Sequence, residues 1–119
     1  MTPPLVLVCL DIAADSHATF ATAEAMTISI LATAQRDVAM RFAKRGENKF
    51  AGVATVQGEQ TGLPLVDGAV AHLECRMHAR HPAGDHTIIV AEVLGGHTHH
   101  GDALLYGDRA FGHLTPLTP

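Results

Sequence analysis

The stretch AVAHLECRMHARHPAGDHTIIVAEVL, residues 69–94, decides the fold class. Its two flanks, residues 69–80 and 85–94, are the longest strand candidates in the chain, because apolar residues alternate with polar ones or run together over strand-like lengths. Residues 81–84 (HPAG) between them have the composition of a turn. The stretch therefore predicts an antiparallel β-hairpin.

Alternation along residues 69–80 predicts which face of the first strand is buried. Side chains two positions apart point to the same side of a strand, so the segment presents two sets of side chains. We expect the first set to face a core and the second mostly to face away. The first is Ala69, Ala71, Leu73, Cys75 and Met77, and the second is Val70, His72, Glu74, Arg76 and His78.

The segments around this hairpin alternate between strand and helix patterns. Before it we expect a buried strand at residues 5–10 (LVLVCL), a helix opened by Asp15 and Ser16 that ends near residue 25, a strand at 26–31, and a helix from Thr33 to Gly46. Residues 47–68 suggest strand fragments joined by turns, residues 95–101 a polar loop tip, and residues 103–114 a final strand pair. The order predicts a mixed sheet or barrel with helices packed outside it.

Length and composition bound the class of protein. A chain of 119 residues with 47% apolar and 17% charged residues predicts one domain over residues 1–119, with residues 115–119 as a frayed tail. A net charge of −4 without a basic cluster argues against a nucleic-acid partner. No apolar run approaches the ~18 residues of a membrane span, which predicts a soluble, cytoplasmic protein with no membrane partner. We expect Cys9 and Cys75 to be small core hydrophobes in a reducing compartment.

The run His97-Thr98-His99-His100 raises the question of a metal site. His97 and His99 could share one strand face, and imidazole suits zinc, copper or nickel. Two imidazoles with no cysteine or second carboxylate nearby make a weak site, and glycines flank the segment. We therefore favour a solvated loop tip and assign no metal.

Five segments, in order, resemble successive blocks of the flavin reductase-like, FMN-binding split-barrel family. They are PPLVLVCLD (3–11), RFAKRGENKFAGV (41–53), GLPLVDGAVAHLECR (62–76), AGDHTIIVAEVL (83–94) and LLYGDRAFGHL (104–114). The resemblance implies a mainly β split barrel with flanking helices and an NAD(P)H-dependent flavin reductase. It further implies FMN, or alternatively FAD, as cofactor, NADH or NADPH as co-substrate, a homodimer, and a partner oxygenase that receives the reduced flavin.

The resemblance also shows where this sequence departs from the family. Members usually begin upstream of the Pro3-Pro4 block, with a strand and a Ser/Asn-rich segment that holds the flavin phosphate, so the barrel is expected to be incomplete at its N-terminus. Ala13, Ala14 and Asp15 stand where the family typically offers serines and a basic residue. The alternative function is therefore a non-catalytic or truncated flavin-binding scaffold.

The same resemblance assigns candidate site residues, each beside a plainer interpretation. His86 matches a Gly-x-His block and is implied as the catalytic histidine at the nicotinamide and flavin site; otherwise it is a hairpin histidine bonded to backbone. Lys49 could meet a phosphate and Phe50 could line the flavin pocket; otherwise they are a solvated lysine and a core phenylalanine. Ser16 and His17 remain as phosphate ligands, although an N-cap alone explains Ser16. Ser29 stands where the family often has a flavin-site asparagine.

Overall fold

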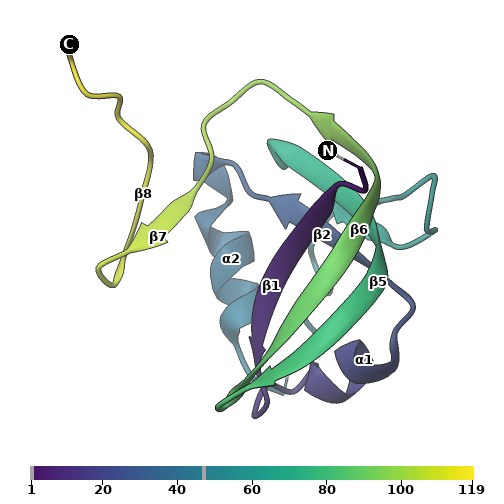
Figure 1. The fold of residues 1–119 in the computed structure, drawn as a ribbon. Helices are drawn as coiled ribbons and strands as arrows, with labels where there is room; N and C mark the ends of the chain where they lie inside the picture. The colour runs from purple at the N-terminus through teal and green to yellow at the C-terminus, as the bar shows by residue number, and fades with distance from the viewer. Residues whose placement is uncertain (1, 47) are drawn as a thin grey trace.

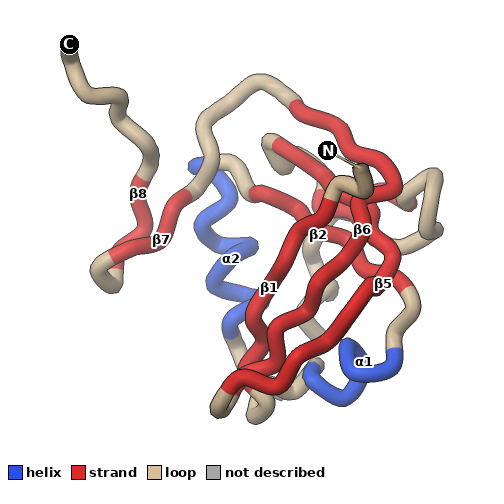
Figure 2. Tube along the Cα trace, in the orientation of Figure 1, coloured by secondary structure: helices blue, strands red, loops and turns tan. Residues whose placement is uncertain are grey.

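A computed structural model describes residues 2–46 and 48–119 (Figure 1). Strands dominate the described chain, and the two α-helices lie outside them (Figure 2). The elements in order are β1 (Leu5–Asp11), α1 (His17–Thr22), β2 (Ala25–Ile30), the 3-10 turn η1 (Thr33–Gln35), α2 (Arg36–Ala43), β3 (Thr55–Gln57), β4 (Pro64–Val66), β5 (Ala71–Ala83), β6 (His86–Thr98), β7 (Leu105–Gly107) and β8 (Ala110–Gly112).

The main sheet has the strand order β1-β6-β5-β2, and every neighbouring pair is antiparallel. The predicted hairpin is confirmed as β5 and β6, but its turn is Gly84-Asp85 and not residues 81–84. Gly84 has φ of +61°, which tight two-residue turns require and which glycine adopts without strain. Pro82 stays within β5 because β2 pairs only with residues 71–76 of that strand, so one side of β5 is an open edge there.

Strand β6 runs further than the sequence pattern suggested. Residues 95–98, expected to belong to a polar loop tip, pair with residues 71–74 of β5. The backbones approach so closely that a Cβ on Gly96 would lie 2.9 Å from the carbonyl oxygen of His72. The glycines in this segment therefore permit close strand pairing, although their composition predicts a loop.

The predicted strand at residues 5–10 is confirmed as β1, but it is not buried. It forms an edge of the sheet, and its side chains alternate: Val6 and Val8 pack on the core, whereas Leu5 is 46% and Leu7 63% exposed. Cys9 lies on the same outer face and is exposed, so its predicted core position is wrong. An apolar run gives no alternation from which to distinguish an edge strand from a central one.

The core lies on the other face of the sheet, where Met26, Cys75, Ile89 and Ala91 pack together. The predicted core position of Cys75 is confirmed, since its side chain is inaccessible. His72 and Glu74, expected to face away, are only 6% and 5% exposed. Segments around the β3–β4 hairpin account for this burial, because they bring Val66 to His72 and Thr61 to Glu74.

The helices are shorter than predicted. Helix α1 ends at Thr22 because β2 begins at Ala25, and α2 ends at Ala43, so Gly46 lies in the turn beyond it with φ of +72°. Hairpin β3–β4 adjoins β2 through the bond from Thr27 Oγ1 to the Pro64 carbonyl, at 2.7 Å. The β7–β8 hairpin stands away from the sheet (Figure 1). Within the described ranges, neither helix has the length and apolarity that crossing a bilayer would need.

Candidate functional site

A cavity of about 460 Å³, which we call the aromatic cleft, lies between α1, β2, α2 and β4 and brings together segments far apart in the sequence. Four residues that the sequence suggested for cofactor binding line it: Ser16, Ser29, Lys49 and Phe50. The other lining residues are Phe20, Thr27, Leu31, Ala39, Phe42, Pro64 and Val66.

Two phenylalanines shape the apolar part of the cleft. The rings of Phe42 and Phe50 meet edge to face, with centroids 5.1 Å apart and planes at 85°. Phe50 is 47% exposed, so it offers ring surface to a ligand and is not the core residue of the plainer interpretation. Aromatic rings of this kind stabilise a flat heteroaromatic ligand by stacking or edge contacts.

Hydroxyl groups supply the polar contacts of the same cleft. Ser29 Oγ accepts a bond from the Val66 amide at 3.0 Å, which leaves its own O–H able to donate to a ligand. Ser16 occupies the N-cap position of α1, yet its side chain makes no capping bond. The predicted N-cap position of Ser16 is therefore confirmed, but its side chain does not cap the helix, and Ser16 also lines the cleft.

The aromatic cleft continues into a cavity of about 290 Å³, which we call the charged end. The two cavities share Ser16, Phe42 and Lys49, and the remaining lining residues are Leu10, Asp11, Ala14, Asp15, Ala43 and Arg45. Asp15 Oδ2 accepts a bond from the Gly46 amide at 2.8 Å, and Asp15 Oδ1 lies 3.9 Å from an Arg45 guanidinium nitrogen. Two carboxylates, Asp11 and Asp15, and two cations, Arg45 and Lys49, thus stand at the polar end of one elongated site.

Two other predicted residues lie apart from this cleft. His17 is on α1, but its Nε2 bonds Thr87 Oγ1 at 2.9 Å, and it lines a separate cavity of about 80 Å³ beside Arg80. His86 opens β6, where its Nδ1 lies 2.7 Å from Asp85 Oδ1, and it is not part of the cleft lining. The roles suggested for His17 and His86 stay predictions.

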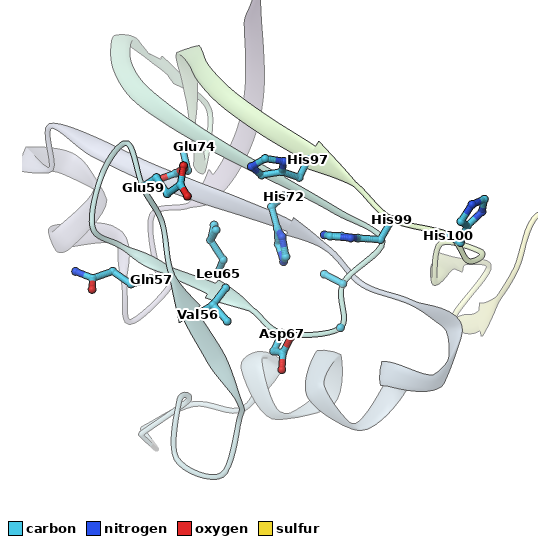
Figure 3. Close-up of a pocket in the computed structure, with 12 residues that line it drawn as sticks. Val56, Gln57, Glu59, Leu65, Asp67, His72, Glu74, His97, His99 and His100 are labelled. Carbon is cyan, nitrogen blue, oxygen red and sulfur yellow. The ribbon is translucent and has the colours of Figure 1, made fainter.

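A second cavity, of about 670 Å³, lies where β5 and β6 meet the β3–β4 hairpin (Figure 3). His72 lies within it, 2.6 Å from the Val66 carbonyl through Nε2, and its ring centroid is 5.5 Å from that of His99. Three carboxylates also line this cavity, those of Glu59, Asp67 and Glu74, so its charge does not favour an anionic ligand. Among residues 2–46 and 48–119, no three ligand-type side chains are arranged to hold a metal ion.

Sequence reasoning missed several residues of the aromatic cleft. Thr27 and Leu31 lie two positions on either side of Ser29, and strand alternation could have placed them on its face. Phe42 lies three positions after Ala39 on α2, which is helical spacing for one face. Nothing in the sequence indicated that this helix face and that strand face would enclose one cavity.

Comparison with known proteins identifies relatives of the chain. A family model described as the flavin reductase like domain matches residues 1–115. The actinorhodin polyketide dimerase of Streptomyces coelicolor is 43% identical over 96% of this chain and 64% of its own length. The reductase component of the 4-nitrophenol 4-monooxygenase/4-nitrocatechol 2-monooxygenase of Rhodococcus opacus is 42% identical over 97% of this chain and 61% of its own length. The chain thus spans less than two thirds of either relative.

A solved structure of a related protein has the same fold as this chain. The NADH:FAD oxidoreductase of Streptomyces globisporus, in complex with NAD and FAD fragments, superposes with a TM-score of 0.91 at 35% sequence identity. The match covers 97% of this chain and 70% of that one. The mainly β, split-barrel fold with flanking helices that the resemblance implied is therefore confirmed.

Proposed function

The chain belongs to the flavin reductase like domain family, and on that premise we propose that it transfers a hydride from NADH or NADPH to a flavin, FMN or FAD. The observation that carries the proposal is the aromatic cleft, where Phe42 and Phe50 form an apolar wall beside hydroxyl groups and a lysine. A bound flavin would itself accept the hydride, and the protein's part is to bind it, orient it and exclude water.

The residues of the cleft fit such a ligand. Phe42 and Phe50 offer apolar ring surface for the tricyclic ring, whose polar edge needs hydrogen-bond donors. The Ser29 hydroxyl supplies one donor from β2, and Ser16 supplies another from the start of α1. Lys49, next to the ring-binding Phe50, offers a positive charge toward an anionic tail.

The proposed partners follow from the same family. We propose an oxygenase as the acceptor of the reduced flavin, and the name of the Rhodococcus relative as the reductase component of a monooxygenase supports this. We propose the cytoplasm as the location.

A homodimer is the assembly we propose, and one face of the sheet supports it. Leu5, Leu7 and Cys9 of β1 point away from the core, and Ile88 and Val90 lie opposite Cys9 and Leu7 in the register with β6. Paired residues in antiparallel strands share a face, so these five side chains form one apolar surface, which we call the outer patch. Contiguous apolar surface of this kind is typical of an interface.

Titration of the 119-residue chain with FMN, followed by fluorescence quenching, tests the function, with NADH oxidation then measured in the same sample. We expect saturable quenching and NADH oxidation above the free-flavin background. Phe50→Ala should weaken FMN binding about five- to tenfold, the loss of about 1 kcal/mol of ring contact. Tyr106→Ala, which removes an exposed ring outside the cleft, is the matched control.

The possible outcomes separate the two functions. No saturable quenching would contradict flavin binding by this chain. Quenching without NADH oxidation would contradict the reductase and support the non-catalytic flavin-binding scaffold.

A further inference from the structure

The charged end of the cleft already holds an anion of its own, the carboxylate of Asp15. One of its oxygens accepts a bond from the Gly46 amide at 2.8 Å, and the other lies 3.9 Å from the Arg45 guanidinium. A backbone N–H and a guanidinium are the groups that phosphate oxygens bind in proteins. Asp15 thus occupies the Gly46 amide, and its charge lies close to the Arg45 guanidinium that a ligand phosphate would otherwise approach.

A second carboxylate adds to this effect. Asp11 lines the same cavity, and its Oδ1 accepts a bond from the Ala13 amide at 2.8 Å. Two carboxylates therefore balance the two cations of the charged end, Arg45 and Lys49. A phosphate monoester carries about −1.5 to −2 charge at pH 7, so it would enter a site without excess positive charge.

The position of Asp15 along the cleft decides which part of a flavin it meets. The apolar part, with Phe42 and Phe50, suits the ring, and the charged end opens from it past Ser16 and Lys49. A ring that lies against the two phenylalanines with its tail toward the charged end brings that tail to Asp15. Riboflavin presents a neutral hydroxyl there, whereas FMN presents a phosphate.

We propose that Asp15 is a specificity-determining residue that lowers the affinity of this chain for FMN relative to riboflavin. The inference rests on the proposed function, since it assumes that a flavin binds in the aromatic cleft. Asp15 acts through its negative charge, which repels the phosphate and offsets the positive charge of Arg45. The side chain is 43% exposed, so solvent screening keeps the expected effect moderate.

Fluorescence titrations with riboflavin and with FMN test the inference on the wild-type chain, Asp15→Asn and Asp108→Asn. Asp15→Asn removes the charge but keeps an oxygen that accepts the Gly46 bond, so the local fold is retained. We expect it to tighten FMN binding about three- to tenfold and to change riboflavin binding by less than about twofold. The gain should shrink between about 50 mM and about 500 mM NaCl, because salt screens exposed charges.

The control variant removes an equal charge elsewhere. Asp108 lies in the β7–β8 turn with φ of +49°, a conformation that asparagine tolerates, and it is not part of the cleft or charged-end lining. Asp108→Asn should leave the ratio of the two affinities unchanged. An equal gain in this control would overturn the inference, because net charge alone would then explain it.

Two further outcomes separate the inference from the proposed function. If both flavins bind the wild type and Asp15→Asn leaves the ratio of their affinities unchanged, the role of Asp15 is refuted while flavin binding stands. If neither flavin binds any of the three proteins, the proposed function fails and the inference fails with it.

Discussion

Glu74 is a carboxylate with 5% exposure on β5, and its hydrogen bonds explain how the fold tolerates it. Oε1 accepts bonds from the Gln60 amide (3.1 Å), the Thr61 amide (2.9 Å) and the Thr61 hydroxyl (2.8 Å). Burial alone raises the pKa of Glu74, but the bonds from Thr61 and Gln60 and the charge of His97 outweigh it and lower the pKa. Glu74 therefore holds the turn after β3 in its charged form.

The pH dependence of stability follows from that lowered pKa. A carboxyl group whose pKa is lower in the folded state stabilises the fold at pH values above its pKa in the unfolded chain, about 4.3. This contribution is lost as the pH falls through the pKa of the folded state. Glu74→Gln should lower the free energy of unfolding by about 1–3 kcal/mol at neutral pH and by less at about pH 3.5. Urea unfolding at both pH values measures this loss of stability, and Glu24→Gln, at an exposed residue, is the control. An equal loss at both pH values would contradict the role of the charge.

His86 is the residue to which the family resemblance assigns a catalytic role, and Asp85 lies beside its ring. Its Nδ1 lies 2.7 Å from Asp85 Oδ1, and the hydrogen bond to His86 together with the imidazole charge lowers the pKa of Asp85. If His86 donates a bond to the nicotinamide, His86→Gln should raise KM for NADH about tenfold and leave FMN affinity unchanged, since His86 lies outside the cleft lining. Steady-state NADH oxidation and FMN titration measure the two effects. A KM no different from that of the exposed His81→Gln control would identify His86 as a hairpin histidine only.

At the scale of elements, local patterns predicted the strands and their pairing better than their burial. The β5–β6 hairpin followed from alternation and turn residues, because both are properties of neighbours in the chain. The burial of His72 and Glu74 did not, because it depends on the segment that follows β3, which is distant in sequence. The candidate site also divides into a part that the sequence indicates and a part that it does not. The family resemblance indicated Lys49 and Phe50, whereas the packing of α2 against the cleft depends on the tertiary fold.

Helix α1 depends on an arginine from another element. The guanidinium of Arg80 on β5 donates two bonds to the Phe20 carbonyl, at 3.0 and 2.9 Å, and one to the Ala23 carbonyl at 2.6 Å. These bonds satisfy carbonyls at the end of a six-residue helix, which is too short to be stable alone. Because α1 positions Ser16 and Phe20 in the cleft, Arg80 acts on the site through the helix.

Replacing Arg80 should therefore affect both stability and binding. Arg80→Met should lower the free energy of unfolding by about 1–3 kcal/mol and weaken FMN binding, as measured by urea unfolding and fluorescence titration. Arg76→Met is the control on the same strand, because Arg76 is 63% exposed and its ion pair with Glu92 contributes at most about 1 kcal/mol. An equal loss in the two variants would show that α1 does not need the arginine.

For the molecule as a whole, the sheet has two faces with different roles. One face packs on the core around Ile89 and Ala91, and the other presents the outer patch defined above. Exposed apolar side chains on an edge strand promote non-specific aggregation unless a specific partner covers them. The proposed homodimer provides such a partner, so assembly should depend on this face.

Leu7 is the most exposed leucine of the outer patch, at 63%, and Leu7→Arg tests the dimer directly. Burying an arginine against apolar side chains of a second subunit is costly, so the variant should raise the dimer dissociation constant at least about tenfold, as measured by sedimentation velocity. Its free energy of unfolding as a monomer should change by no more than about 0.5 kcal/mol, because Leu7 points away from the core. Leu117→Arg, at a residue that is 96% exposed near the C-terminus, is the matched control and should leave the dimer intact. A wild-type chain that remains monomeric at every concentration would refute the dimer, and a dimer equally stable in Leu7→Arg would place its interface on another surface.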